Sequence, residues 1–564
     1  MRIPILSDIH NDLKLGTKVD EVPFSKYPRP SLVRDSFINL NGRWNNDILV
    51  PFPLQSANSG FKGKVPEEYI YERSFVVPKG FLKDKLLLHF DGVDCITQVY
   101  VNQTLVGTHV GGYNAFVIDI TGAISRTPEA QNSLKVVVTD RLSHQYPYGK
   151  QRKRRGGMWY TPVSGIWKSV WLESVSNDYI RAIEITPSLT GIQLNIESEA
   201  NDYEIEVYDR GELIVSEKTC YDLVDIDIPN PHLWSPEDPY LYDIVIKTPN
   251  DKVSSYFGLR TVSIGKVDGI SRILLNGEPY FFHGVLDQGY YPEGIYTPNC
   301  EEDYIDDIKR LKDLGINTIR KHIKIEADCF YEACDRLGII VFQDMVNNGA
   351  YKYFRDTIFP TLGYKKEDDK KVHVTEDTME NFAVGVKETL LELYNHPSIV
   401  YYTIFNEGWG QFNADLMYEW VRSMDSSRII DATSGWFKQK LSDVDSPHVY
   451  FHVERLKYTD RPLILSEFGG LSYRIPEHSY SRFINYGYGK CKSPEETGKA
   501  IVKLYEDQVI PEIERGLCGS IYTQAFDVED ETNGLYTYDR KVCKCDPEAM
   551  RELAKKLRIK VSDR

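Results

Sequence analysis

The sequence predicts a multidomain protein in which two β-sandwiches precede a (β/α)8 barrel. The chain has 564 residues, which at about 100–200 residues per domain is enough for three to five domains. Short β-branched and aromatic segments without helical periodicity occupy the chain before residue 266. From there onward, strand-like segments alternate with helical ones, which is typical of an α/β fold.

The first sandwich is predicted over residues 1–176. Its segments are rich in β-branched and aromatic residues, and Gly, Pro and Asn separate them at short intervals. Such spacing without a helical pattern in between indicates a β-sandwich. The segments are residues 69–77, 85–93, 98–107, 116–121 and 134–140.

A second sandwich is predicted over residues 177–265, which is about the length of one immunoglobulin-like domain. The same short segments of β type continue here, and the boundary is expected near Asn177. The segments are residues 185–198, 203–209, 242–248 and 254–264.

The third domain, residues 266–564, is predicted to be the barrel. Apolar residues recur at helical spacing from Ile305 to Leu314, with Asn299 and Glu302 as an N-terminal cap. Further helices are expected up to residue 337, up to about residue 394 and over residues 500–513. Strand-like segments alternate with the helices, and their number is that of a (β/α)8 barrel. The expected strands are residues 280–285, 316–320, 339–344, 398–407, 428–433, 448–452, 462–468 and 519–524.

Composition excludes several classes of protein. The formal net charge of −16 gives no electrostatic reason to bind nucleic acid or anionic lipid. No stretch reaches the ~18 apolar residues that a membrane span needs. Asp8 and Asp12 interrupt the N-terminus where an export signal requires an apolar core. Nine scattered cysteines fit reduced thiols, so we expect a cytoplasmic enzyme.

Aromatic residues are frequent, with 38 tyrosines and 8 tryptophans. Tyr and Trp combine an apolar face with a polar edge, which suits a sugar ring with its C–H face and hydroxyl rim. Tyrosine is also common on β-strands, so composition alone does not decide between these two explanations.

Two of the predicted barrel strands end in a glutamate after an apolar run, at Glu407 and at Glu467. They are strands four and seven, which face each other across the barrel mouth, where barrel enzymes carry their catalytic groups. A carboxylate there is costly without a partner or a function. Glycoside hydrolysis needs such a pair, one a protonated acid and the other an ionised nucleophile. Arg320, which ends strand two, would hold Glu467 ionised.

The chain also resembles glycoside hydrolase family 2, which includes β-galactosidases, β-glucuronidases and β-mannosidases. Residues 90–121 and 157–173 resemble the N-terminal jelly-roll domain of that family, which implies a jelly roll for the first sandwich. Residues 231–244 and 257–264 resemble its immunoglobulin-like domain. Five further segments resemble the catalytic barrel of the family: residues 275–285, 311–322, 330–344, 395–410 and 461–470.

The resemblance implies a retaining exo-β-glycosidase in which Glu407 is the acid/base and Glu467 the nucleophile, with their carboxyl groups ~5–5.5 Å apart. By the same resemblance, Asn406 would bind the sugar 2-hydroxyl and Tyr450 would contact the nucleophile. Polar residues at the other strand ends are either ligands of sugar hydroxyls or partners of one another within the barrel mouth. The further substrate-binding residues that we expect are Arg320, Asp287, Gln288, His322, Asp344 and Trp409, the last from the Asn-Glu-Gly-Trp-Gly segment.

Several family features are missing, and they bear on the metal and on the sugar. The magnesium-binding acid and histidine of the β-galactosidases have no match in residues 342–352, so we expect no metal and no other cofactor. The glucuronidases bind the sugar carboxylate through a lysine shortly before a Gly-aromatic run, and no lysine stands in this place before Gly534. We therefore expect a neutral glycoside, a β-galactoside first. A β-glucuronide, a β-mannoside or an arabinoside is the alternative.

Two other functions are open to such a chain. A non-catalytic carbohydrate-binding protein of this family should have lost one carboxylate, and both are present. A barrel lyase or aldolase would need a Schiff-base lysine or a metal cluster at the strand ends, and we find neither. The basic run of residues 151–155 is typical of a solvated loop, although its position leaves open that it reaches over the active site. Assembly into a homo-oligomer is also open.

Overall fold

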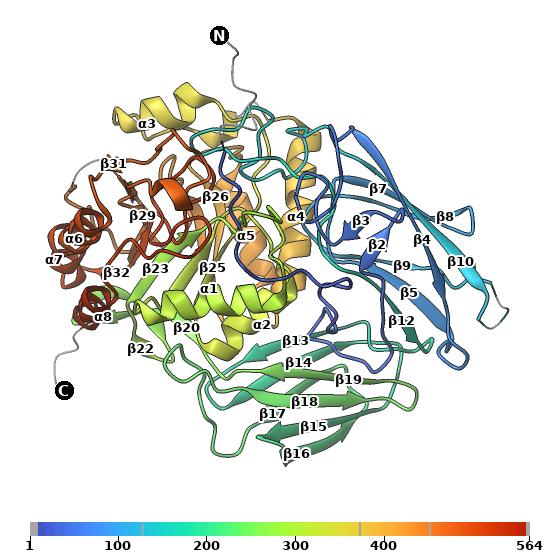
Figure 1. Ribbon diagram of the computed structural model, residues 1–564. Helices are drawn as coiled ribbons and strands as arrows, with labels where there is room; N and C mark the ends of the chain where they lie inside the picture. Colours follow the sequence, from blue (N-terminus) through green and yellow to red (C-terminus); the bar gives the residue numbers. More distant parts are fainter. Residues whose placement is uncertain (1–9, 126, 128, 372–373, 451–452, 560–564) are drawn as a thin grey trace, which may run out of the picture.

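The computed structural model describes residues 10–125, 127, 129–371, 374–450 and 453–559. Figure 1 shows three parts in contact: a blue sandwich, a green sandwich, and a barrel that continues from green to red. The predicted fold class is confirmed: a jelly roll, an immunoglobulin-like sandwich and a barrel follow one another along the chain. The first sandwich lies beside the barrel and the second lies below it in the view of Figure 1.

The jelly roll consists of two four-stranded antiparallel sheets, in the orders β1-β12-β5-β9 and β4-β10-β7-β8. Apolar side chains from both sheets, such as Leu88 and Val136, are buried between them. The segment expected as one strand over residues 98–107 is a hairpin, because Asn102 and Gln103 turn the chain with φ angles of 47° and 68°. The strands are β1 (Ile38–Asn39), β4 (Glu68–Val76), β5 (Lys85–Phe90), β7 (Ile96–Val101), β8 (Thr104–Val110), β9 (Phe116–Asp119), β10 (Gln131–Thr139) and β12 (Val170–Val175), with the short pairs β2 (Gly42–Trp44) and β3 (Ile48–Val50), and β6 (Val93–Asp94) and β11 (Gly165–Ile166).

The second sandwich pairs a three-stranded sheet, β13-β14-β17, with a four-stranded sheet, β16-β15-β18-β19. Leu194, Ile205 and Ile244 belong to its buried core. A third sheet, β20-β21-β22, connects this sandwich to the barrel, and its first strand runs across residue 265. The domain boundaries near residues 177 and 266 stay predictions. The strands are β13 (Ala182–Pro187), β14 (Gly191–Glu197), β15 (Tyr203–Asp209), β16 (Glu212–Thr219), β17 (Leu223–Asp227), β18 (Tyr242–Lys247), β19 (Lys252–Phe257), β20 (Val262–Val267), β21 (Ile270–Leu275) and β22 (Glu278–Pro279).

All eight predicted barrel strands are present, in one parallel sheet of the order β27-β26-β25-β24-β23-β32-β29-β28. The sixth was expected over residues 448–452, of which 451–452 lie outside the described residues. The sheet nearly closes, because Gly435 after β27 donates its N–H to the carbonyl oxygen of Ser446 before β28 at 2.8 Å. Every residue of these strands is buried, as expected for parallel strands that are covered on both faces. The strands are β23 (Phe282–Asp287), β24 (Thr318–Lys321), β25 (Ile340–Asp344), β26 (Ile399–Asn406), β27 (Ile429–Ser434), β28 (His448–Val449), β29 (Leu463–Phe468) and β32 (Leu517–Tyr522), with the short pair β30 (Leu471–Ser472) and β31 (Gly489–Lys490) outside the barrel sheet.

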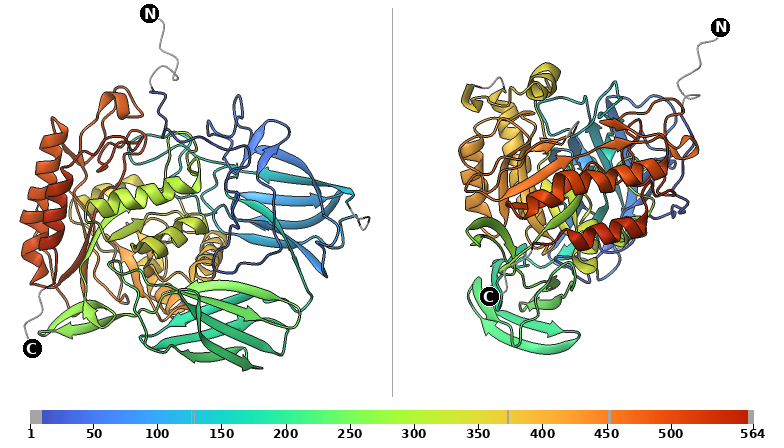
Figure 2. Two further views of the ribbon diagram at one scale, coloured as in Figure 1. Left: turned by 60° about the horizontal axis from the view of Figure 1, so that its bottom comes forward. Right: turned by 90° about the vertical axis from the view of Figure 1, so that its left-hand side faces the viewer.

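Helices cover the barrel on most sides, but not between every pair of strands. In the described residues between β27 and β29 there is no helix, so the expected alternation is wrong there. The expected cap of α1 is also wrong: Cys300 is the N-cap residue and makes no side-chain cap bond. Figure 2 shows α6 and α8 side by side on the barrel side remote from the jelly roll. The helices are α1 (Glu301–Asp313), α2 (Asp328–Leu337), α3 (Phe359–Thr361), α4 (Glu376–Leu393), α5 (Ala414–Met424), α6 (Pro494–Leu504), α7 (Ile510–Ile513) and α8 (Pro547–Lys556), and π- and 3₁₀-turns cover residues 354–358, 369–371, 476–478 and 505–509.

The N-terminal segment ties the three parts together. Asn11 donates from its side-chain nitrogen to the carbonyl oxygens of Pro476 and Ser479 on the barrel, at 2.7 and 2.6 Å. Further along, the guanidinium of Arg34 is buried between the two sandwiches. It donates to Glu173 of β12 at 2.9 Å and to Asp251 of the second sandwich at 2.8 Å. One buried cation therefore holds carboxylates from two domains.

Arg34→Met is expected to lower the free energy of unfolding by about 3–5 kcal/mol, because two buried carboxylates lose their shared cation. Urea unfolding followed by circular dichroism measures the loss. Arg181→Met is the matched control, since this arginine pairs with the exposed Glu197 at 3.0 Å, where an ion pair contributes ~0–1 kcal/mol. Equal losses in the two variants would contradict this account of the domain interface.

All nine cysteines are free in the structure. The sulfurs of Cys543 and Cys545 lie 3.4 Å apart, but no group of potential metal ligands among the described residues includes them. None of the helices in the described residues combines the length and the apolar character that crossing a membrane requires.

Candidate active site

Four neighbouring polar groups stand at the C-terminal ends of barrel strands. Asp344 ends β25 and Asn406 ends β26. Arg320 and Glu467 are the second-last residues of β24 and β29. All four are at most 4% exposed. Because the strands are parallel, their C-terminal ends meet at one face of the barrel, and the structure brings these side chains into contact there.

The guanidinium of Arg320 is the centre of this cluster. Its Nε donates to Asp344 Oδ1 at 2.9 Å. Its two terminal nitrogens donate to Glu467 Oε1 at 3.0 Å and to Asn406 Oδ1 at 2.9 Å. Arg320 therefore fixes the orientation of the Asn406 amide, with the NH₂ group as the remaining donor, and places a positive charge against Glu467.

Glu467 is held as a carboxylate. Tyr450 donates its O–H to the second carboxylate oxygen, Oε2, and the Tyr450 ring stacks on Tyr488 with centroids 4.1 Å apart. Burial raises the pKa of Glu467, but the charges of His448 and Arg320 outweigh burial and lower the pKa to about 2. An ionised carboxylate with two fixed donors is suited to nucleophilic attack.

Glu407 follows β26 and turns away from the strand with a φ of 55°, a left-handed conformation that non-glycine residues rarely adopt. Its side chain is 14% exposed, compared with 5% for Glu467. One oxygen of Glu407, a nitrogen of His448 and one oxygen of Glu467 lie within 4.8 Å of one another. The two glutamates predicted from the strand ends therefore share one site.

His448 lies between the two glutamates, and the sequence interpretation missed it. Its Nδ1 is 2.8 Å from Glu407 Oε1, and its Nε2 is 2.9 Å from Ser434 Oγ and 3.6 Å from Glu467 Oε1. The side chain is fully buried. His448 stands two residues before Tyr450, and side chains at i and i+2 of a strand share a face. That spacing is the signal that could have found it.

His322 and Gln288, two of the predicted sugar ligands, each keep a buried polar atom that has no hydrogen-bond partner in the described part of the chain. His322 Nδ1 is 2.7 Å from Asp344 Oδ2, while its Nε2 has no hydrogen-bond partner among the described residues. The same holds for the amide oxygen of Gln288. A buried polar atom without a partner is uncommon, so both residues remain candidate ligands of sugar hydroxyls.

Asp287 and Trp409 are engaged elsewhere. Both Asp287 oxygens accept hydrogen bonds, from Lys321 Nζ at 2.6 Å and from the Gly289 N–H at 3.0 Å. Of the two roles expected for Asp287, the structure therefore shows pairing within the barrel mouth. Trp409 is 2% exposed and donates to the carbonyl oxygen of Gly349 at 3.0 Å. Its ring packs against Trp159, with centroids 5.3 Å apart. Trp409 supports the wall of the site, and a direct contact with substrate stays a prediction.

The last residue of the basic run 151–155 contacts the barrel, whereas residues 152–154 are exposed. Arg155 lies 3.4 Å from Glu529 and 3.6 Å from Asp530 on the loop after β32. Just beyond the run, Tyr160 donates its O–H to Glu531 on the same loop. The expectation of a solvated loop therefore holds only for residues 152–154, and the jelly roll contributes to the barrel mouth.

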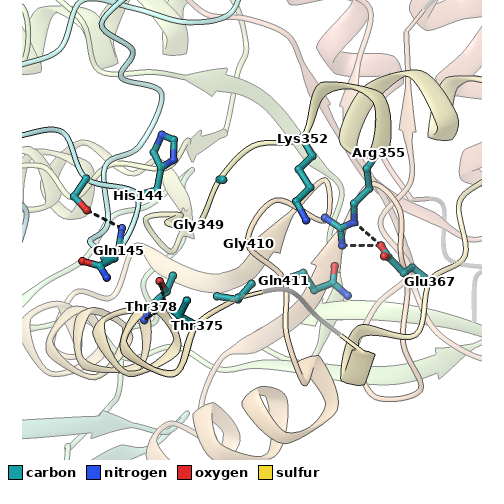
Figure 3. Close-up of a pocket in the computed structure, with 13 residues that line it drawn as sticks. His144, Gln145, Gly349, Lys352, Arg355, Glu367, Thr375, Thr378, Gly410 and Gln411 are labelled. Carbon is teal, nitrogen blue, oxygen red and sulfur yellow. Dashed lines mark hydrogen bonds and ion pairs between the residues drawn. The ribbon is translucent and has the colours of Figure 1, made fainter.

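A cavity of about 250 Å³ opens beside the segment that follows Glu407 (Figure 3). His144 and Gln145 of the jelly roll form one side, and Lys352 and Arg355 of the segment after β25 lie opposite them. Arg355 donates to the carbonyl oxygen of Gly408 at 2.9 Å, which ties the wall of the cavity to the Glu407 segment. Hydroxyl, amide and cationic groups line this space.

One group of described residues has the composition and spacing of a metal site, and it consists of Glu407, His448 and Glu467. A cation between Glu407 and Glu467 would compete with Arg320, which already lies 3.0 Å from Glu467 Oε1. It would also occupy both carboxylates of this group. The expectation that the enzyme needs no metal stays a prediction.

Family models match three segments of the chain. The galactose-binding-like domain of glycosyl hydrolase family 2 matches residues 53–183, the model described as glycosyl hydrolases family 2 matches residues 171–260, and the TIM barrel domain of this family matches residues 266–470. The order and the extent of these matches agree with the three parts of the fold.

Named relatives fall into two groups. A β-galactosidase of Thermoanaerobacter pseudethanolicus is 27% identical over 58% of this chain and 43% of its own length. A β-glucuronidase of Bacteroides fragilis is 24% identical over 60% of this chain and 49% of its own length. The matches thus span less than half the length of these relatives. A solved β-D-glucuronidase of Dictyoglomus thermophilum has the same fold, with a TM-score of 0.75 over 94% of this chain and 98% of that chain at 19% identity. On the evidence of the three family models, the chain belongs to glycoside hydrolase family 2.

Proposed function

We propose that the chain is a retaining exo-β-glycosidase that removes a terminal β-linked neutral sugar, a β-galactoside first, through a covalent glycosyl-enzyme. The observation that carries the proposal is the pair Glu407 and Glu467, with oxygens within 4.8 Å of each other at the ends of two facing strands. Retaining glycosidases hold their carboxyl groups ~5–5.5 Å apart, whereas inverting enzymes need about 6.5–9.5 Å to admit a water molecule.

In the first step, a Glu467 oxygen attacks the anomeric carbon and the bond to the leaving oxygen breaks. Glu407 gives its proton to that oxygen, and an ester between Glu467 and the sugar forms. In the second step, Glu407 takes a proton from water, and the water oxygen attacks the same carbon. The ester bond breaks, Glu467 is restored as a carboxylate, and the sugar leaves with its β configuration.

The surrounding residues prepare both carboxylates for these roles. Arg320 and Tyr450 keep Glu467 ionised and oriented. His448 fixes the Glu407 carboxyl at 2.8 Å. The free NH₂ group of Asn406 is the donor we assign to the sugar 2-hydroxyl, a hydrogen bond that strengthens in the transition state.

The proposal of a neutral sugar rests on the charges around the site. Residues 530–534 contain no cation and include two acids, Asp530 and Glu531. A sugar carboxylate buried beside these two acids would meet like charges, and the loop itself supplies no cation to offset them. The relatives named above include both β-galactosidases and β-glucuronidases, so the choice of the glycone depends on this local argument.

A panel of nitrophenyl β-glycosides, assayed with and without EDTA, tests the proposal. We expect kcat/KM for the galactoside to exceed that for the glucuronide by at least about tenfold, a difference of ~1.4 kcal/mol in transition-state binding. We expect EDTA to leave both values unchanged, since no step uses a metal. A clear preference for the glucuronide would contradict the choice of sugar, and a strong loss on chelation would contradict the metal-free mechanism.

The non-catalytic alternative is disfavoured by the same pair, because both carboxylates are present and converge on one site. A cytoplasmic location and a homo-oligomeric state stay predictions from the sequence.

A further inference from the structure

We propose that Glu531 of the barrel and Lys150 of the jelly roll form a pair that selects the glycone: Glu531 accepts hydrogen bonds from sugar hydroxyls, and Lys150 compensates its charge. The inference rests on the proposed function and goes beyond it by naming the residues that discriminate a neutral sugar from its uronic acid. It also assigns the jelly roll a direct part in substrate choice.

Glu531 is a buried carboxylate with acceptor capacity to spare. It is 2% exposed and lies on the loop that follows β32, the strand beside Glu467. Asn533 Nδ2 donates to its Oε1 at 3.0 Å, and the Tyr160 O–H donates to its Oε2. A carboxylate offers about four acceptor positions, so two remain for a ligand. These two donors also hold the carboxylate in one orientation.

Lys150 reaches the same place from the jelly roll. A Cβ on its neighbour Gly149 would lie only 3.0 Å from the carbonyl oxygen of Ile323, directly after His322, so the loop passes close over the end of β24. The Lys150 carbonyl oxygen accepts the N–H of Tyr160 at 2.9 Å, which sets Lys150 beside the residue that bonds Glu531. Among the described residues, no carboxylate oxygen lies within ion-pairing distance of its ammonium group.

The electrostatics agree with this placement. Burial raises the pKa of Glu531, and the nearby charge of Lys150 is the largest influence that opposes burial. The charge of Lys150 also acts on Glu467 and on His322. The charge of one ammonium group therefore acts on the nucleophile, on His322 and on Glu531.

The loop that carries Lys150 is fastened to the Glu531 loop. The Thr161 N–H donates to Glu529 Oε1 at 3.0 Å, and Arg155 lies 3.4 Å from the other Glu529 oxygen. Tyr160 adds its bond to Glu531. Two domains thus fix the pair, as a precise recognition site requires.

The chemistry of the pair favours hydroxyl groups. A sugar hydroxyl can donate to the free lone pairs of Glu531. A sugar carboxylate would instead meet two negative charges, those of Glu467 and Glu531, and only one positive charge, that of Lys150. Hydrogen bonds to charged groups contribute about 1.5–3 kcal/mol, or roughly 10- to 150-fold in kcat/KM. The loss of Glu531 and the loss of Lys150 should therefore change sugar preference in opposite directions.

Two variants test the pair, Glu531→Gln and Lys150→Gln, each assayed on the preferred neutral glycoside and on the uronide of the same ring configuration. We expect Glu531→Gln to lower kcat/KM for the neutral substrate by roughly 10- to 150-fold and to shift the ratio of the two substrates toward the uronide. We expect Lys150→Gln to shift the ratio further toward the neutral substrate. A ratio that stays within about twofold, or that moves in the same direction in both variants, overturns the proposal.

The controls separate recognition from loop docking and from folding. Arg154→Gln removes an exposed cation from the same loop and should leave both substrates unaffected. Glu529→Gln weakens the docking of the loop and should affect both substrates alike. Labelling of Glu467 by a 2-fluoro glycoside confirms that each variant is folded and active. Absence of labelling in the wild-type enzyme would overturn the proposed function itself, which distinguishes that failure from an unchanged substrate ratio.

Discussion

Glu467→Ala is expected to lower kcat by roughly four to six orders of magnitude, because no other group near the anomeric carbon can form the glycosyl-enzyme. Arg320 and Tyr450 would then surround an empty space of the size of a carboxylate. Azide enters such a space and attacks the anomeric carbon directly, in a single displacement. We therefore expect azide to restore part of the turnover and to give a glycosyl azide of inverted, α configuration.

The control for this variant is Glu477→Ala, which removes an exposed carboxylate from the segment between β29 and β32. It should keep wild-type activity. Near wild-type activity in Glu467→Ala, or an azide product of β configuration, would show that the nucleophile is another residue. Thermal unfolding of both variants establishes that the comparison concerns catalysis.

Glu407→Ala is expected to lose about 10²- to 10⁴-fold in kcat/KM on substrates whose leaving group needs a proton. A dinitrophenyl glycoside leaves without protonation, so its first step should be nearly unaffected. The second step still lacks its base, and the glycosyl-enzyme should accumulate as a burst of dinitrophenol. Stopped-flow absorbance measures this burst.

Azide again distinguishes the roles of the two glutamates. In Glu407→Ala it should attack the accumulated glycosyl-enzyme and give a glycosyl azide of retained, β configuration. Equal losses for protonated and unprotonated leaving groups, or an inverted azide product, would contradict the assignment of Glu407 as the acid/base. The Glu477→Ala variant serves here as well, since it alters one carboxylate outside the site.

The barrel strands and the polar residues at their ends could be predicted from the sequence because buried parallel strands are continuous apolar runs. A polar residue that closes such a run is conspicuous, and this located Arg320, Asp344, Asn406 and Glu467. Glu407 was located in the same way, because it directly follows the last residue of β26. The local pattern was sufficient here because the barrel itself brings the strand ends together.

Features that depend on distant contacts could not be predicted in this way. His448 contacts Glu407 from 41 residues away, and Tyr160 contacts Glu531 across 371 residues. Asn299 has a favourable sequence for capping α1, but its side-chain oxygen, the atom that would accept the capping hydrogen bond, accepts from Asn58 Nδ2 at 2.7 Å instead. Tertiary hydrogen bonds outweigh such local preferences.

The missing helices between β27 and β29 have a related explanation. The expected alternation followed from the barrel pattern, and these connections carry little helical periodicity of their own. Their backbone is held by pairing with the strands instead: Asp445 accepts the N–H of Ile464 at 2.9 Å and donates its own N–H to Pro462 at 2.9 Å. A hydrogen-bonded segment at a strand edge satisfies the backbone as a helix would.

Trapping of the glycosyl-enzyme shows directly whether Glu467 is the nucleophile. The wild-type protein is incubated with an activated 2-deoxy-2-fluoro β-glycoside of its preferred sugar, digested, and analysed by mass spectrometry. We expect one fluorosugar per chain, on the peptide that contains Glu467, and no label in Glu467→Ala. Labelling of another residue, or rapid hydrolysis of the parent glycoside to an α-configured product without any label, would contradict a retaining mechanism through Glu467.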